Sequence, residues 1–467
     1  MPSVRQWKLD TDAISRVLHG PTAHGHRQVE EILARARELE GLDAADVSVL
    51  CTLSDPDLLG ELFRAARDVK EEIYGRRLVL FTPLYVSNLC ANDCAYCAFR
   101  SSNRGLKRRA LSREEIATET ASLVDEGHKR VLLVAGEAYP KEGFDYILEA
   151  IDTVYGVKRP KGEIRRINVN VAPLEVDEFR RLKDHNIGTY QIFQETYHRE
   201  AYAGVHLRGK KTDFDYRLAA MDRAFTAGID DVGIGVLFGL ADWRYEILAM
   251  QQHIKHLEDR FGVGPHTISV PRLEPASGAE LASQPPMPVS DLAFRKIVAI
   301  LRLMVPYTGI IMSTRESADI RRETFALGVS QISAGSRTNP GGYSEHGTDV
   351  QVSAGSQFSL GDHRGLDEVV RDVASLGYVP SFCTGCYRLG RTGADFMDLA
   401  RPGEIKKHCD PNGLSSFQEY LRDFASPETC EVGETCIVDV LNDMDEGPRH
   451  KAMKMLYSVR SGKSDVF

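Results

Sequence analysis

Residues 111–137 read LSREEIATETASLVDEGHKRVLLVAGE. Ser112 is followed three residues later by Glu115, which is the capping-box pattern of a helix start. The apolar residues that follow keep helical spacing as far as Gly127, which fits a helix C-cap. The β-branched run 131–135 then predicts a strand. The stretch therefore predicts one helix–strand unit of an α/β protein.

Similar runs continue on both sides of this unit, and most of the intervals between them contain a plausible helix. The expected strands cover residues 77–83, 131–135, 166–171, 189–193, 231–238, 266–271, 309–314 and 329–334. Eight strands over about 255 residues match the size of a (β/α)8 barrel, in which the loops at the C-terminal strand ends carry the chemistry. We therefore expect a barrel of the TIM type.

Three regions are expected along the chain. Residues 1–75, rich in Arg, Glu, Leu and Ala, predict an N-terminal helical extension. Residues 76–352 predict the barrel, and the polar loop 335–349 marks its end. Residues 353–467 predict a mainly helical C-terminal domain that contains its own cysteine cluster.

Composition restricts the class of protein. The 467 residues are 42% apolar and 27% charged, as in globular proteins, and the net charge of −9 gives no reason to expect nucleic acid or an anionic membrane as partner. Residues 1–18 show no export signal, and no run approaches the ~18 apolar residues of a membrane span. We expect a cytoplasmic protein. Its nine cysteines are too sparse for a disulfide scaffold, and six lie in two clusters, which indicates metal binding.

The first cluster, SNLCANDCAYCAFR (residues 87–100), places Cys90, Cys94 and Cys97 in the spacing C-x3-C-x2-C. It follows the first expected strand, on the catalytic face of a barrel. Three thiolates on one loop can hold three irons of a 4Fe-4S cube while the fourth iron stays open to a small molecule. The alternatives are a zinc knuckle and a ferredoxin-type site completed by a distant cysteine.

With Tyr96 before Cys97, this motif resembles the signature of the radical S-adenosylmethionine (SAM) family. The resemblance implies that the amino and carboxylate groups of SAM chelate the open iron, and that one electron cleaves SAM to a 5′-deoxyadenosyl radical. Ala135, Gly136 and Glu137, at the end of the second strand, resemble the element that binds the SAM amino group.

Further SAM contacts follow from the same resemblance. Gly233 and Gly235, in VGIGVLFG (residues 232–239), lie where the family places backbone against the adenosine. Glu195 and Arg217 are expected to be polar contacts to SAM. Taken alone, a glycine at the end of a strand usually forms only a turn.

A second triad lies in FCTGCYRLGRTGADFMDLARPGEIKKHCDPNGL, with the spacing C-x2-C-x22-C. Its members are Cys383, Cys386 and Cys409. Because C-x2-C pairs are common in zinc proteins, a zinc site completed by His408, Cys430 or Cys436 remains an alternative.

The barrel and tail together resemble the HydG family, the tyrosine lyases of FeFe-hydrogenase maturation within the biotin synthase/ThiH-like radical SAM enzymes. The resemblance rests on CTGCYRLGRTG and PGEIKKHCDPNGL in the tail, FQETYH (residues 193–198), HTISVPRLEPASG (266–278) and STRESADIRRETFALGVSQISAGSRT (313–338). It covers most of the chain.

This second resemblance implies cleavage of the Cα–Cβ bond of L-tyrosine to p-cresol and dehydroglycine, which yields CO and cyanide. An auxiliary 4Fe-4S cluster on the second triad would carry a fifth iron, which collects these ligands as an Fe(CO)2(CN) precursor. His266 aligns with the histidine that binds this iron, and a free or bound cysteine is also expected there. Implied partners are a flavodoxin or ferredoxin as electron donor and the maturation proteins HydE and HydF.

The strand assignment places His266 at the start of the sixth strand, on the barrel face opposite the first triad. Two metal sites would then cap the two ends of one barrel, with a channel for the small fragment between them. The alternative is a hydrogen-bonded histidine at a strand start, with no ligand role.

For the substrate carboxylate, a guanidinium is suitable because its fork binds both oxygens. Arg321 aligns with the arginine that has this role in related aromatic amino acid lyases, and Arg322 replaces it if the register shifts by one residue. The basic run 100–113 is expected to be a solvated loop, or else a surface that docks a reductant or closes the site.

Two rival functions remain open. The thiamine-pathway tyrosine lyase resembles the barrel but lacks the C-terminal triad. A non-catalytic iron–sulfur carrier or scaffold predicts two closed clusters and no SAM cleavage. Cys430 or Cys436 could close the auxiliary site by supplying a fourth thiolate, which would exclude the extra iron.

Overall fold

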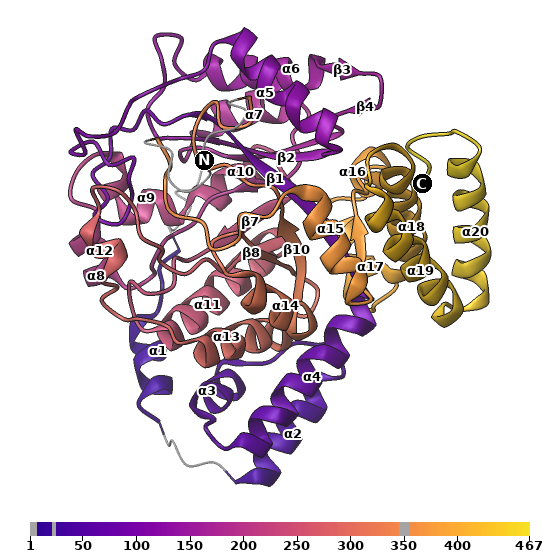
Figure 1. Cartoon of the computed structure of the whole chain (residues 1–467). Coiled ribbons are helices and arrows are strands. Elements are labelled where there is room, and N and C mark those ends of the chain that lie inside the picture. The colour runs from indigo at the N-terminus through magenta and orange to yellow at the C-terminus, as the bar shows by residue number, and fades with distance from the viewer. Residues whose placement is uncertain (1–6, 21–24, 345–354) are drawn as a thin grey trace.

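A computed structural model of the chain describes residues 7–20, 25–344 and 355–467. The expected boundary between residues 352 and 353 lies outside these described residues. In Figure 1 the N-terminal helices lie below a central barrel, and the C-terminal helices stand to its right.

Eight parallel strands form the barrel, and pairing of the last strand with the first (Leu80 with Ile332) closes it. The strands are β1 (Arg77–Ser87), β2 (Arg130–Ala135), β5 (Arg166–Asn170), β6 (Tyr190–Gln191), β7 (Val232–Gly235), β8 (Thr267–Ser269), β9 (Gly309–Met312) and β10 (Val329–Ser333). The predicted (β/α)8 barrel is confirmed. A short antiparallel hairpin, β3 (Lys158–Arg159) and β4 (Gly162–Glu163), lies outside it.

Helices between the strands cover the outside of the barrel. They are α5 (Arg113–Glu126), α6 (Asp145–Gly156), α7 (Val176–Asp184), α8 (Arg199–Val205), α9 (Phe214–Leu218), α10 (Ala220–Thr226), α11 (Trp243–Phe261), α12 (Glu280–Ser283), α13 (Asp291–Met304) and α14 (Ala318–Leu327), with the short 3-10 helix η1 (Lys210–Thr212). Because side chains fill the inside and helices cover the outside, most strand residues are buried on both faces of the sheet. β9 and β10 are buried along their whole length.

The helix–strand unit at residues 111–137 forms as its sequence predicts. Ser112 Oγ accepts from the Glu115 N–H, and the Glu115 side chain accepts from the Ser112 N–H, which completes a capping box at the start of α5. Gly127 ends the helix with φ 106°, in the left-handed region. A Cβ atom there would also lie 2.8 Å from the ring of Tyr420, so the glycine lets the C-terminal domain pack against this turn.

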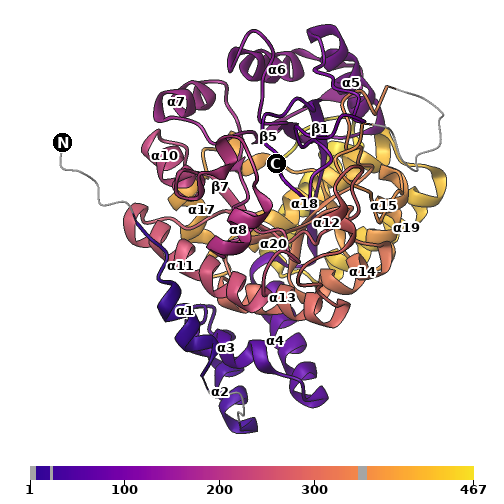
Figure 2. The same cartoon turned by 90° about the vertical axis from the view of Figure 1, so that its left-hand side faces the viewer.

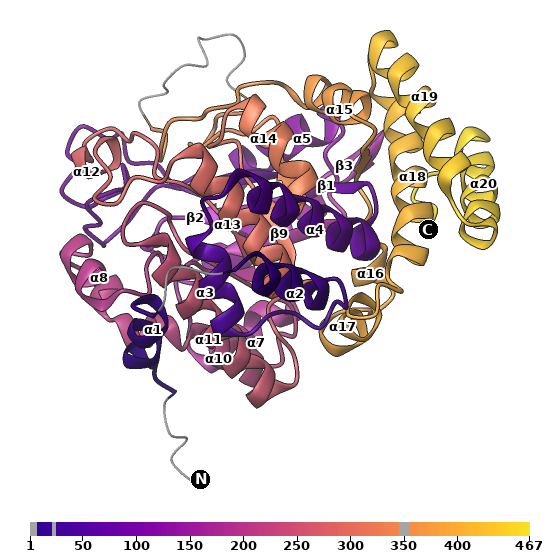
Figure 3. The same ribbon diagram turned by 90° about the horizontal axis from the view of Figure 1, so that it is seen from below.

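The N-terminal extension consists of α1 (Thr11–Leu18), α2 (His26–Ala36), α3 (Ala44–Thr52) and α4 (Pro56–Tyr74). Figure 3 shows α2, α3 and α4 lying across the barrel next to α13. This cover explains why α13 is buried almost all round. The expected helical extension therefore completes one side of the barrel core.

The C-terminal region contains α15 (Leu366–Ser375), β11 (Val379–Ser381), α16 (Gly385–Arg388), α17 (Gly393–Ala400), α18 (Lys406–Asp423), α19 (Pro427–Asp443) and α20 (Glu446–Arg460). β11 was not expected from the sequence. It pairs with the first residues of β1, Val379 opposite Arg77 and Ser381 opposite Val79. This pairing attaches the segment before Cys383 to the N-terminal end of the barrel.

None of the helices in the described part of the chain is both long and apolar enough to span a bilayer. The cytoplasmic location expected from the sequence stays a prediction.

Candidate active site

The first cysteine triad lies in the loop that leaves the C-terminal end of β1. Cys90, Cys94 and Cys97 line one pocket inside the barrel mouth. The loop is held by its backbone, because Ala95 N–H donates to the Val205 carbonyl at 2.8 Å and Cys97 N–H to the Cys94 carbonyl at 3.1 Å. The structure therefore brings the three candidate ligands together on the catalytic face of the barrel.

Burial favours the protonated form of these thiols. It raises the pKa of Cys97 to about 11 and also raises the pKa of Cys90 and Cys94. Gln357 Nε2 lies 3.7 Å from the Cys97 sulfur. Because thiolates rather than thiols bind iron, metal binding at this loop must release protons.

Gly136 lets the loop after β2 lie against the cysteine loop. A Cβ atom at this position would lie 2.2 Å from the Leu89 carbonyl oxygen, so a larger residue would force the backbones apart. The Gly136 N–H donates to the Ser87 carbonyl at 2.9 Å. Ala135, Gly136 and Glu137 all line the same pocket as the cysteines.

Four charged side chains form a buried cluster beside the triad. Arg217 Nη1 donates to Glu137 Oε1 at 2.8 Å, and Lys211 Nζ donates to Glu195 Oε1 at 2.5 Å. Arg217 Nη2 lies 3.7 Å from the same Glu195 oxygen, which connects the two pairs. Asn92 Nδ2 donates to Glu137 Oε2 at 2.7 Å. Sequence reasoning found both glutamates and Arg217, but missed Asn92 and Lys211.

These side chains remain charged although they are buried. Burial opposes ionisation of Glu137, but the charges of Arg217 and Lys211 outweigh it and hold the pKa of Glu137 below its ordinary value. The same balance, with Lys211 as the larger favourable charge, lowers the pKa of Glu195. The pocket thus presents ionised carboxylates and cations, which suits a zwitterionic ligand.

Tyr96 and Glu195 are fixed by local geometry. The Tyr96 hydroxyl lies 2.8 Å from His206 Nε2, and burial lowers the pKa of His206 to about 2, so the ring is neutral. Glu195 has φ 71°, a left-handed conformation that is uncommon without glycine. Both residues line the pocket.

Gly233 and Gly235 do not line this pocket. A Cβ atom on Gly233 would lie 2.5 Å from Thr267 Oγ1, and one on Gly235 would lie 2.8 Å from the Ser269 carbonyl oxygen. The two glycines therefore make room for neighbouring strands inside the barrel. Leu237, two residues further on, does line the pocket.

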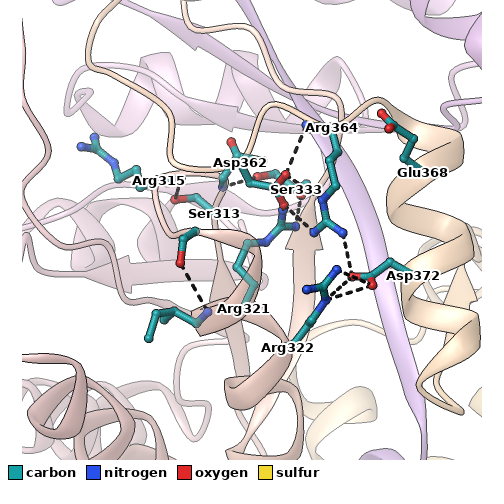
Figure 4. Close-up of polar contacts among 12 residues, drawn as sticks. Ser313, Arg315, Arg321, Arg322, Ser333, Asp362, Arg364, Glu368 and Asp372 are labelled. Atoms are coloured by element: carbon teal, nitrogen blue, oxygen red, sulfur yellow. Dashed lines mark hydrogen bonds and ion pairs between the residues drawn. The ribbon is translucent and has the colours of Figure 1, made fainter.

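Arg321 does not reach the pocket either. Its guanidinium is fully buried, forms an ion pair with Asp362 and donates through Nη2 to the Ser333 carbonyl at 2.6 Å (Figure 4). Arg322 pairs with Asp372 at 2.9 Å. The geometry thus gives both arginines a role in attaching the chain after the barrel.

Arg315, unlike Arg321, lines the pocket, as Arg217 also does. Its guanidinium lies 3.3 Å from the centroid of the Phe358 ring, and burial lowers its pKa. In Figure 4 its side chain points away from the Arg321–Asp362 pair. Within the described ranges it forms no ion pair. Its position directly after β9, at a C-terminal strand end, is the signal that sequence reasoning passed over.

The second triad lies at the other end of the barrel. Cys383 follows β11, Cys386 lies in α16 and Cys409 lies in the first turn of α18. Cys386 and Cys409 share a hydrogen bond, which lowers the pKa of Cys386 and raises that of Cys409 well above its ordinary value. The Arg77 guanidinium interacts electrostatically with all three thiols. The structure therefore brings this triad together beside a buried cation.

His266 lies at the same end of the barrel as the second triad. Its ring centroid is 4.4 Å from that of Phe396 and 6.3 Å from that of Tyr387, which follows Cys386. Its Nδ1 is 3.6 Å from Asp231 Oδ2 and has no hydrogen-bond partner among the described residues. Both carboxylate oxygens of Asp231 are also buried without a hydrogen bond from a described residue. Unpaired buried groups are costly, so this region fits a further polar or metallic group.

Cys430 and Cys436 are engaged away from the second triad. The Cys430 thiol donates to the Leu421 carbonyl at 3.3 Å, and the Cys436 thiol lies 3.5 Å from the Tyr378 carbonyl oxygen. In the described part of the chain, no three His, Cys, Asp or Glu side chains are arranged around a single ion. The three ligands of a cubane bind three different irons, so they need not converge on one point. The arrangement gives no support to the zinc alternatives.

Comparison with known proteins agrees with this architecture. Residues 84–249 match the model of the Radical SAM superfamily, and residues 269–379 match the Biotin and Thiamin Synthesis associated domain. A crystal structure of HydG, described as a maturase of the [FeFe]-hydrogenase, is 44% identical with a TM-score of 0.94 and covers 98% of this chain and 99% of its own. The chain belongs to the HydG family of radical SAM proteins.

Two further proteins show the breadth of the similarity. HydG from Carboxydothermus hydrogenoformans is 41% identical, with a TM-score of 0.83, over 96% of this chain and 97% of its own. The 2-iminoacetate synthase of Escherichia coli (strain K12) is 33% identical over 83% of this chain and 97% of its own. Membership in the radical SAM family implies a 4Fe-4S cluster and SAM as cofactors of this HydG-family chain.

The pocket fits these cofactors. Cys90, Cys94 and Cys97 offer three thiols and leave one iron of a cubane without a protein ligand. Glu137 and Arg217 lie beside them with opposite charges, as the amino and carboxylate ends of SAM require.

Proposed function

We propose that this chain cleaves the Cα–Cβ bond of L-tyrosine, giving p-cresol and dehydroglycine, and converts the latter to CO and cyanide for an Fe(CO)2(CN) precursor of the FeFe-hydrogenase active site. One observation carries the proposal. One pocket of the barrel holds a cysteine triad and Arg315, which forms no ion pair with any described residue, and a second cysteine triad lies at the other end of the barrel.

A 4Fe-4S cluster with SAM on its open iron supplies, when bound, a 5′-deoxyadenosyl radical by one-electron cleavage of SAM. The chain positions SAM through its own charges. Glu137 accepts a hydrogen bond from the amino group, and Arg217 keeps that carboxylate ionised and oriented. Gly136 leaves the space that this approach needs.

Tyrosine is held by Arg315. Its guanidinium binds both oxygens of the substrate carboxylate, a geometry that lysine does not offer. Phe358 stacks on the guanidinium and fixes its plane. Tyr85 and Phe193 add aromatic surface to the same pocket, which suits a phenol side chain. We therefore propose Arg315, in place of Arg321, as the carboxylate ligand.

At the other end, Cys383, Cys386 and Cys409 would hold the auxiliary cluster, and His266 would bind the extra iron together with a free or bound cysteine. Arg77 balances part of the thiolate charge. The described structure gives Cys430 and Cys436 other contacts, which favours an open auxiliary site. A flavodoxin or ferredoxin, HydE and HydF remain the proposed partners, in the cytoplasm.

The thiamine-pathway reaction is the second candidate. The E. coli relative is a 2-iminoacetate synthase, and 2-iminoacetate is another name for dehydroglycine. The second triad, with Arg77 and His266 nearby, favours the reaction that continues to CO and cyanide. An enzyme that only releases dehydroglycine needs no further metal site.

The test is a reaction with the anaerobically reconstituted protein, SAM, dithionite and L-tyrosine. We expect p-cresol and 5′-deoxyadenosine to form together, and a Cys94→Ser variant to form neither. If the intact protein has both clusters but yields neither product, the lyase proposal fails.

A further inference from the structure

The chain that follows the barrel returns to the mouth that holds the first triad. Gln357 comes 260 residues after Cys97 in the sequence, yet its Nε2 lies 3.7 Å from the Cys97 sulfur. This mouth of the barrel faces the viewer in Figure 2, with α8 and α12 in front and with α18 and α20 behind the barrel. None of the roles proposed above involves the Gln357 side chain.

Backbone hydrogen bonds fix the position of Gln357. Its N–H donates to the Thr338 carbonyl at 2.9 Å, and its carbonyl accepts from the Ala98 N–H of the cysteine loop at 3.3 Å. Two residues further on, Ser359 N–H donates to the Pro275 carbonyl at 2.8 Å. The segment is thus bonded to the cysteine loop, to the loop after β8 and to the loop after β10.

Tyr85 fixes the orientation of the Gln357 side-chain amide. The Tyr85 hydroxyl donates to Gln357 Oε1 at 2.7 Å, which turns Nε2 toward the Cys97 sulfur. The Tyr85 ring is held edge-on against Phe99, with 6.0 Å between the ring centroids. The opposite orientation of the amide would place Oε1 against a metal-bound thiolate, so that two acceptors would face each other. The amide therefore presents a hydrogen-bond donor to Cys97.

A donor at this sulfur has a consequence for electron uptake. Hydrogen bonds to the sulfurs are among the features that set the reduction potential of an iron–sulfur cluster. One-electron reduction adds negative charge to the irons and their thiolates, and an N–H group that points at one sulfur stabilises this charge. The Phe99 backbone N–H also donates to the Cys97 sulfur, and Gln357 adds a side-chain donor that a single substitution can remove.

We propose that Gln357 is a positioning residue that acts through Cys97 and raises the reduction potential of the cluster at the first triad. The inference rests on the proposed function, because the cluster that accepts the electron is the one held by Cys90, Cys94 and Cys97. In the step concerned, the cluster gains one electron from a reductant such as dithionite, and Gln357 exchanges neither a bond nor a proton. Its amide stabilises the reduced state and so favours the electron uptake that precedes SAM cleavage.

The experiment is a redox titration of the reconstituted holoenzyme without tyrosine. Dithionite reduces the cluster in the presence of mediator dyes, and EPR measures the reduced fraction. The test variants are Gln357→Leu, which removes the donor, and Gln357→Glu, which keeps the shape of the side chain but places a carboxylate near the sulfur. Gln284→Leu, at an exposed position directly after α12, is the matched control. Each protein is also titrated in the Cys383→Ser/Cys386→Ser background, so that the first cluster is measured alone.

We expect Gln357→Leu to lower the equilibrium constant for reduction about tenfold, which is about 59 mV in the midpoint potential of a one-electron couple. Gln357→Glu should lower the potential further, because a negative charge near the sulfur opposes the added electron. A role of Gln357 in shape alone predicts the reverse order, since glutamate preserves the shape of the side chain. Gln284→Leu should keep the potential of the parent protein.

Unchanged midpoint potentials in both Gln357 variants overturn the inference, and so does a larger shift in Gln357→Leu than in Gln357→Glu. An equal shift in Gln284→Leu overturns it too. Iron content and thermal unfolding show which variants keep an intact cluster, and the isosteric Gln357→Glu keeps the test decisive if Gln357→Leu does not fold. Because the titration uses no tyrosine, the predicted order of potentials supports the inference even where p-cresol does not form. A parent protein that assembles no cluster at the first triad overturns the inference and the proposed function together.

Discussion

Arg217 of α9 donates to Glu137, in the loop after β2, across the mouth of the barrel at 2.8 Å. This ion pair connects two βα loops beside the first cysteine triad, and Asn92 from the cysteine loop donates to the same carboxylate. The pair places a carboxylate and a guanidinium side by side in the cysteine pocket. The SAM-binding proposal depends on this contact more than on any other.

Neutralising Glu137 should weaken SAM binding. Glu137→Gln removes the acceptor for the SAM amino group and leaves Arg217 without its nearest counter-charge, so we expect the dissociation constant of SAM to rise about tenfold, or about 1.4 kcal/mol. Calorimetric titration of the reconstituted protein measures this. Glu142→Gln, an exposed glutamate in the same loop, is the control and should bind SAM normally. Wild-type affinity in Glu137→Gln would contradict the assignment.

Adding one carbon at Gly136 should disturb the cysteine loop. Because a Cβ atom would lie 2.2 Å from the Leu89 carbonyl oxygen, Gly136→Ala should cost about 1–3 kcal/mol of stability and lower iron incorporation at the first triad. Gly156→Ala is the matched control, since a Cβ atom there meets no atom within 4 Å. Iron analysis and thermal unfolding compare the two. If both alanine variants load iron equally well, the close approach is not essential.

The two arginines of the β9–β10 region should separate substrate binding from stability. Arg315→Met should raise KM for tyrosine about tenfold or more with little change in Tm, because it removes only a pocket cation. Arg321→Met should instead destabilise the fold by about 3 kcal/mol, since it leaves Asp362 buried with Arg364 as its remaining partner at 2.7 Å. A KM effect in Arg321→Met without loss of Tm would restore Arg321 as the ligand.

Buried His253 should make stability depend on pH. Burial lowers the pKa of His253 from 6.5 to about 4, while its Nδ1 lies 2.8 Å from the Tyr197 hydroxyl. Between pH 6.5 and pH 4 the unfolded chain therefore binds one more proton than the folded chain. The neutral His253 makes its full contribution to the free energy of unfolding above pH 6.5, and this contribution is lost as the pH falls toward 4. Between pH 7.5 and 5.5 the loss should be about 1 kcal/mol.

Urea unfolding of the protein and of His253→Asn at both pH values checks this. The variant should lose about 1 kcal/mol less on acidification, whereas the exposed His450→Asn should behave like the parent. Identical pH slopes in all three proteins would show that His253 does not titrate on unfolding.

The barrel can be predicted from the sequence because its strands are β-branched runs of the right spacing, and α5 begins and ends at residues that cap helices through local contacts. β11 cannot be predicted in this way. It has three residues with Pro380 at its centre, a residue that lacks an N–H and is atypical of strands, and only pairing with β1 defines it.

The candidate site, too, can be predicted from the sequence only in part. Cysteine spacing indicates the first triad because its three ligands lie within eight residues, and it indicates the second through the pair Cys383 and Cys386, which Cys409 follows after 22 residues. Arg315 and Arg321 are six residues apart, one in the loop after β9 and the other in α14, and the local sequence pattern does not tell which one faces the pocket. The choice depends on Asp362, which follows the barrel and binds Arg321 from a distant part of the chain.

The central claim is that each triad carries one half of the chemistry. The most direct test compares p-cresol and CO produced by the protein and by its Cys383→Ser/Cys386→Ser variant, with SAM, dithionite and L-tyrosine. The account predicts that the variant still makes p-cresol but no longer yields CO. Unchanged CO output from the variant would contradict it.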